Sequence, residues 1–193
     1  MNPLHIVFAV SAVAYVGIVA AGLRGPVRAI KVVPALSLAV ALFPSHPIAA
    51  AGMVFSAAGD GFLLDKDRFL LAGIGSFLVA HLLFVPAFLT ASGAWPHPGV
   101  VAALLAVAAG ALFAMRPKKP VLKVAVPIYA LTLVAMASAA TTLGPLGVAG
   151  GLTFLVSDSV LSFRLFRRDF PGGDLIVMVT YYGALGLLAA AVP

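Results

Sequence analysis

Eight long apolar segments fill almost the whole chain, and only short connections rich in proline and glycine separate them. A membrane-spanning helix needs about 20 mostly apolar residues. Only 9% of the residues are charged, whereas a soluble globular domain carries about 25%. The sequence therefore predicts an all-α fold, a polytopic membrane helix bundle in which residues 1–193 form a single transmembrane domain. The eight predicted spans are Leu4–Leu23, Val27–Phe43, Ile48–Leu64, Phe69–Leu89, Gly99–Met115, Val121–Thr141, Leu146–Phe163 and Leu175–Val192.

The basic residues predict the orientation of these spans. All 12 Lys and Arg residues lie in or beside alternate connections, beginning with the first. Because positive loops stay in the cytoplasm, we expect both termini on the outer side. The Ala/Gly/Val-rich composition suggests a bacterial inner membrane. The net charge of +6 comes from these short loops, which argues against nucleic-acid binding, and the absence of cysteine excludes disulfides and thiol catalysis.

Two aspartates lie inside predicted spans, in matching surroundings. Asp60 is flanked by two glycines, and Asp158 is flanked by two serines. A Lys followed by a Pro about one turn later also opens both the second and the sixth spans, as Lys31 and Pro34, and as Lys123 and Pro127. These parallels suggest a four-plus-four parallel repeat, although a Lys near a cytoplasmic helix end is common.

Buried carboxylates in hydrocarbon are costly, so they usually face a cavity and serve a function. Two carboxyl groups in one site suit general acid/base catalysis, which we take as the role of Asp60 and Asp158. The alternatives are a hydrogen bond between helices or a relay for protons or cations. Since Asn removes a desolvated charge, we expect Asp60→Asn to keep or raise stability. Gly59, Gly61, Gly73 and Gly75 are expected to make room for an apolar slot beside the acids.

Other polar side chains share this layer. A rise of 1.5 Å per residue places both aspartates and the tyrosines of spans six and eight roughly 6–10 Å from the cytoplasmic helix ends. The candidate substrate-binding residues are Lys31, Ser56, His81, Tyr129, Ser157, Arg164, Tyr181 and Tyr182. Lys31 is alternatively a snorkelling interfacial lysine, the tyrosines an aromatic belt, and His81 a packing residue. The remaining histidines do not converge with the aspartates, so we expect no metal site. Asp174 is expected to be the N-cap of the last span.

Four segments resemble the YhhN/TMEM86 family of eight-span membrane proteins, whose characterised members are lysoplasmalogenases. They are FSAAGDGFLL at 55–64, GSFLVAHLLFV at 75–85, FLVSDSVLSFRLFR at 154–167 and VMVTYYGALGLL at 177–188. The resemblance implies an ether hydrolase that cleaves the vinyl ether of lysoplasmalogens and needs no cofactor. It also implies that Lys31 or the cluster Arg164–Arg168 holds the lipid phosphate.

Two other functions fit the same sequence features. Parallel repeats and kinked helices are also found in transporters, and a lipid-binding membrane protein without catalysis is a third interpretation. Release of aldehyde from a lysoplasmalogen distinguishes the enzyme from both. The sequence does not predict the oligomeric state.

Overall fold

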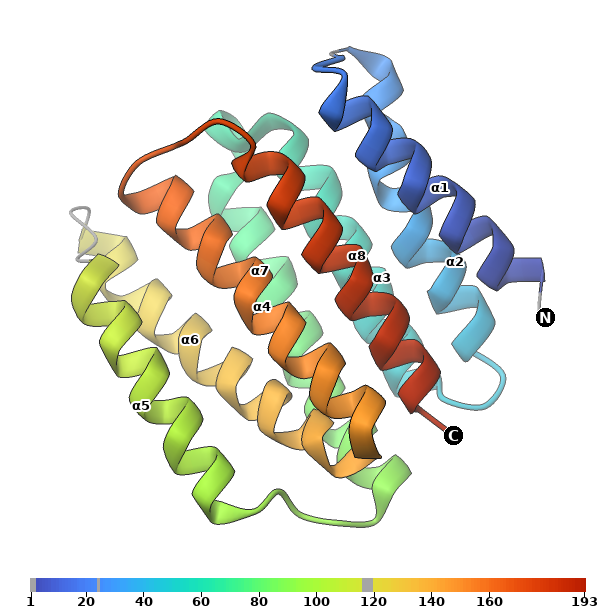
Figure 1. The fold of residues 1–193 in the computed structure, drawn as a ribbon, viewed down its shortest axis with the longest axis vertical. Coiled ribbons are helices and arrows are strands. Elements are labelled where there is room, and N and C mark those ends of the chain that lie inside the picture. Colours follow the sequence, from blue (N-terminus) through green and yellow to red (C-terminus); the bar gives the residue numbers. More distant parts are fainter. Residues whose placement is uncertain (1–2, 24, 116–119) are drawn as a thin grey trace. The chain divides into compact units, whose positions relative to one another are not determined.

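The structure, a computed structural model, describes residues 3–23, 25–115 and 120–193. Within these ranges all regular structure is helical, which confirms the all-α class. Four basic residues used to predict orientation, Arg24, Arg116, Lys118 and Lys119, lie outside the described residues. The α-helices, coloured along the chain in Figure 1, are α1 (Pro3–Ala20), α2 (Val33–Leu42), α3 (Pro47–Phe62), α4 (Lys66–Ser92), α5 (Pro98–Met115), α6 (Pro120–Ala140), α7 (Gly144–Phe166) and α8 (Gly173–Ala191). Three 3-10 segments accompany them, η1 (Pro26–Val32), η2 (Leu63–Asp65) and η3 (Thr141–Leu143).

Four stretches of the described chain are long and apolar enough to cross a membrane. They are Pro3–Ala20, Pro47–Ser92, Pro120–Phe166 and Gly173–Ala191. The second contains α3 and α4, and the third contains α6 and α7, because a 3-10 turn joins each pair. A shorter apolar helix covers Pro98–Ala114. These stretches indicate an integral membrane protein, while the full set of eight spans stays a prediction.

The chain divides into two compact units, residues 1–87 and 88–193, and the boundary falls near the end of α4. In unit 1, α1 packs against α2 and α2 against α3. In unit 2, α5 packs against α6, α6 against α7, and α7 against α8. Helices that follow each other in the sequence are therefore neighbours within each unit, as short connections require.

The second predicted span is not one regular α-helix. Its first part is η1, and the α-helix begins only at Val33. Pro34 lies in the first turn of α2, where its missing N–H group is not needed. Val33, directly before this proline, still has α-helical dihedral angles, with φ −63° and ψ −42°. The change of helix type was not predicted, and it places Lys31 on the 3-10 segment.

Aromatic rings of α4 fill the space beside two glycines of α3. A Cβ atom added to Gly52 would lie 2.5 Å from the Phe84 ring, and one added to Gly59 would lie 2.6 Å from the Phe77 ring. Beside the second contact, the Ser76 hydroxyl donates a 2.7 Å hydrogen bond to the carbonyl of Phe55. The expectation that Gly59 makes room for an apolar slot is therefore wrong, because the Phe77 ring fills that space.

The same correction applies to Gly73. A Cβ atom there would lie 2.7 Å from the side chain of Leu63, which occupies the space beside it. In unit 2, Gly150 approaches Leu188 of α8 in the same way. Gly144 has a φ of +80°, in the left-handed region that favours glycine, where the chain turns from η3 into α7. The N-cap of α8 is Gly172, not Asp174, because Asp174 lies inside the first turn.

Candidate functional site: the surroundings of the two aspartates

Asp60 forms an ion pair with Lys31 inside unit 1. The Lys31 Nζ atom lies 3.3 Å from Asp60 Oδ1, and the two side chains are 7% and 1% exposed. Lys31 comes from η1 and Asp60 from the last turn of α3, and these two elements are packed together. The interpretation of Lys31 as a snorkelling lysine is wrong, because its ammonium group is buried against a carboxylate.

The ion pair also changes the expected effect of Asp60→Asn. Removing one member of a buried pair leaves the other charge without that partner, which costs about 3–5 kcal/mol. We now expect Asp60→Asn to lower stability, since it removes the carboxylate that lies against Lys31. The expectation from the sequence that Asp60→Asn keeps or raises stability assumed that Asp60 has no charged partner.

Asp158 has a different partner, in unit 2. The Tyr129 hydroxyl group of α6 donates a short hydrogen bond to Asp158 Oδ2 on α7. The Asp158 side chain is almost completely buried. Both residues were expected in one layer, and here the hydroxyl group holds one carboxyl oxygen in place. Tyr129 is therefore not a member of an aromatic belt.

A small apolar cavity of about 50 Å³ adjoins this pair. Its walls come from α5, α6 and α7, and most of them are Ala, Val and Leu side chains. Tyr129, Asp158, Ser159 and Ser162 supply the polar part of the lining. A mostly apolar cavity with a few grouped polar side chains is typical of small-molecule sites.

His81 and Ser56 lie in the contact between α3 and α4. His81 shares a helix face with Phe77 and Phe84, which contact the glycines on either side of Ser56. The antiparallel register therefore brings Ser56 and His81 to the same level of this contact. Both side chains are fully buried.

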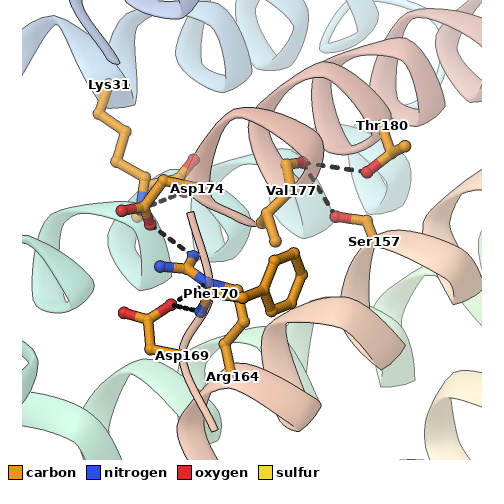
Figure 2. A network of polar contacts seen from close by, with 9 residues as sticks. Lys31, Ser157, Arg164, Asp169, Phe170, Asp174, Val177 and Thr180 are labelled. Carbon is orange, nitrogen blue, oxygen red and sulfur yellow. Dashed lines mark hydrogen bonds and ion pairs between the residues drawn. The ribbon is translucent and has the colours of Figure 1, made fainter. Parts of the chain in front are cut away.

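Three other candidates of unit 2 are buried between α7 and α8. The Ser157 hydroxyl donates a 3.1 Å hydrogen bond to the carbonyl of Val177, as Figure 2 shows. The Tyr181 ring lies edge-on to Phe154, with centroids 5.7 Å apart, and also contacts Tyr182. Tyr181 and Tyr182 are 3% and 4% exposed. Their burial contradicts the aromatic-belt interpretation.

Arg164 ties the end of α7 to the start of α8. Its Nε atom donates to Asp169 at 2.7 Å, and its Nη1 atom donates to Asp174 at 2.6 Å (Figure 2). The guanidinium is buried, whereas both carboxylates are exposed. Two of its five donors are therefore occupied within the protein. Arg167 and Arg168, which follow it, are exposed.

Sequence reasoning missed the contribution of α5 to the cavity. Ala108 and Ala111 line it, and they are three residues apart, so they share one helix face. The only available signal was that these two small residues face the same way as Val107 and Leu112. That signal is weak, because alanine is frequent throughout the segment.

The sequence model of the YhhN family matches residues 27–192 of this chain. The match covers both aspartates, the buried lysine and the cavity. The chain belongs to the YhhN family. This confirms the resemblance read from the sequence.

Curated relatives of this YhhN protein are called lysoplasmalogenases. It is similar to lysoplasmalogenase TMEM86B of Homo sapiens, with 32% identity over 80% of this chain and 70% of that protein. The TMEM86B protein of Sus scrofa is 32% identical over 84% of this chain and 74% of its own length. Lysoplasmalogenase TMEM86A of Bos taurus is 30% identical over 75% of this chain and 66% of its own length. No solved structure matches the chain.

Proposed function

We propose that this protein is a membrane-embedded hydrolase that cleaves the vinyl ether bond of lysoplasmalogens. The products are a fatty aldehyde and glycerophosphoethanolamine or glycerophosphocholine. The names of the relatives support the substrate class. The observation that carries the proposal is a buried carboxyl group, Asp158, in the lining of an otherwise mostly apolar cavity. An amphipathic lipid needs an apolar site with one acidic group beside its reacting bond.

The reaction requires one proton donor and one negative charge. A carboxylic acid protonates the carbon β to the ether oxygen, so that a C–H bond forms and the double bond becomes an oxocarbenium ion. Water adds to the carbon bonded to oxygen and gives up a proton to a carboxylate. The carboxyl group that took this proton then gives it to the glycerol oxygen as the hemiacetal C–O bond breaks, and the hemiacetal hydroxyl returns its proton to the first carboxylate as the aldehyde C=O bond forms. One water molecule is consumed, and the acid is regenerated.

The partners of the two aspartates support a division of these roles. Asp60 forms a 3.3 Å ion pair with the Lys31 ammonium group, so we assign it the negative charge. Asp158 then carries the proton, held in place by the Tyr129 hydroxyl. Two acids in different surroundings commonly divide acid and base roles in this way. Among the other candidates, Lys31 serves through Asp60, and we assign the lipid phosphate to Arg167 and Arg168, which are exposed.

The test is release of fatty aldehyde from lysoplasmenylethanolamine by the purified protein in detergent. General acid catalysis contributes about 10²–10⁴ in rate, so Asp158→Asn should lose at least about 100-fold. Asp60→Asn should be assayed with and without Lys31→Met, since the second change removes the charge that Asp60 balances. If the double variant regains stability but not activity, Asp60 has a chemical role. A transporter or a binding protein would release no aldehyde, and that result would reject the enzyme.

The same proposal includes eight membrane crossings in a bacterial inner membrane, in a four-plus-four arrangement with both termini outside. Each unit holds four α-helices within the described residues, if α4 is assigned to unit 1. At about 2.0 Å per residue for η1 and 1.5 Å for α2, these two segments extend for roughly 29 Å, close to the hydrocarbon thickness. A reporter enzyme that is active only in the periplasm should be active when it is fused to the C-terminus. Cytoplasmic reporter activity would reverse the orientation.

A further inference from the structure

The polar side chains of the unit 2 cavity are grouped together. Ser159 follows Asp158 directly, and Ser162 lies one helical turn further along α7. Tyr129 of α6 joins this group through its hydrogen bond to Asp158. The wall formed by α5 is entirely apolar and includes Ala108 and Ala111. The cavity therefore has an acidic side and a hydrocarbon side.

Its size limits what it holds. One water-sized position needs about 10–15 Å³ of such volume, and the cavity has about 50 Å³. That is room for a short run of carbon atoms and not for a complete fatty chain. Val107 belongs to the lining and is 55% exposed, so the cavity reaches the outer surface of α5. A longer chain can continue from there into the surrounding lipid.

We infer that this cavity binds the vinyl ether and the first methylene groups of a single-chain alkenyl lipid, with the β-carbon against Asp158. This inference rests on the proposed function and names the place where the reacting bond lies. The apolar walls hold the alkenyl chain, while Asp158 supplies the proton. Tyr129 is a positioning residue, because its hydroxyl fixes the orientation of the Asp158 carboxyl group through Oδ2.

Filling the cavity should weaken binding of the probe lysoplasmenylethanolamine. Ala111→Leu and Ala130→Leu place extra carbon atoms in the space that the chain would occupy. Overpacking costs about 1–3 kcal/mol, which corresponds to a rise in KM of roughly 5- to 150-fold. Ala109→Leu is the matched control, because Ala109 is exposed on the same helix and does not line the cavity. Tyr129→Phe should instead lower kcat and leave KM unchanged, which separates positioning from binding.

A second measurement does not depend on turnover. An alkyl-ether lysophosphatidylethanolamine with a diazirine on its first methylene groups cannot be hydrolysed at a vinyl ether. On irradiation it should label residues within 107–112, 126–134 or 155–162, and Ala111→Leu should reduce that labelling while Ala109→Leu should not. Labelling of these residues without any aldehyde release would support lipid binding in the cavity and reject the proposed function. Aldehyde release with labelling elsewhere, or with none, would reject lipid binding in the cavity and leave the proposed function standing.

Discussion

The buried charges of Lys31 and Asp60 depend on each other. Each would be costly alone in an apolar interior, since taking one ion out of water costs several kcal/mol. Together they lie 3.3 Å apart, so each offsets part of the desolvation of the other. The ion pair is therefore expected to add little net stability, whereas removal of one member should lower the free energy of unfolding strongly.

A double-mutant cycle tests this dependence. Lys31→Met and Asp60→Asn should each lower the free energy of unfolding by about 3–5 kcal/mol, because each removes one member of a buried pair. The double variant should lose much less than the sum of the two, because no charge of the pair is left. Thermal unfolding of the purified proteins in detergent measures all four states. Additive losses would show that the two side chains do not interact.

At this scale the sequence predicted which residues matter better than it predicted their partners. Asp60 and Asp158 stand out because acids are rare in apolar segments, and both are buried. The matching Lys-Pro motifs suggested similar surroundings, yet Lys31 is buried and Lys123 is exposed. The first lies on a 3-10 segment and the second on an α-helix. Such a difference in winding leaves no clear trace in the sequence.

In the contact between α3 and α4, the missing side chains of two glycines determine how the helices align. Gly52 and Gly59 are seven residues apart on one face of α3, and Phe84 and Phe77 are seven apart on α4. Each ring occupies the space that a side chain at its glycine would need. This fixes the register of the two helices, with the fully buried His81 and Ser56 between the two contacts.

Two glycines of unit 1 should respond differently to alanine. Gly59→Ala should lower the free energy of unfolding by about 1–3 kcal/mol, because the new methyl group meets the buried Phe77 ring. Gly75→Ala should be neutral or stabilising by up to about 1 kcal/mol, since nothing lies within 4 Å and alanine favours the helix. Thermal unfolding of both variants provides the comparison. Equal effects would mean that the close approach at Gly59 does not determine stability.

The existence of the helices followed from apolar length, but their internal breaks did not. The predicted start of the fourth span at Phe69 coincides with a kink, where φ is −118° and ψ is 19°, although α4 begins earlier, at Lys66. The cavity was expected beside the glycines of spans three and four and is found among alanines of α5 and α6. Glycines indicate close packing as readily as open space, and only tertiary contacts distinguish the two.

For the whole molecule, the two aspartates belong to different compact units. If one reaction uses both, their side chains must reach the same substrate. The chain has no cysteine, so Asp60→Cys with Asp158→Cys provides a specific test. We expect this pair to form a disulfide or to be bridged by a short thiol cross-linker, whereas Asp158→Cys with a cysteine at the exposed position Ala109 should not react.

An intact unlinked double-cysteine protein would refute a shared site. It would leave the cavity in unit 2 in place, because that site involves only unit 2 residues.

The order of synthesis gives the Lys31–Asp60 pair a further consequence. The lysine emerges from the ribosome with the segment η1–α2, before the aspartate of α3 has been made. A lone charged side chain raises the free energy of insertion, by about 2.5–3.5 kcal/mol at the centre of a helix on translocon scales and by less near a helix end, where Lys31 lies. The short segment η1–α2 should therefore wait at the translocon and enter the bilayer with α3 as a neutralised hairpin. Glycosylation mapping of nascent chains should find poor insertion of a chain truncated after α2, rescued by Lys31→Leu or by extension through α3.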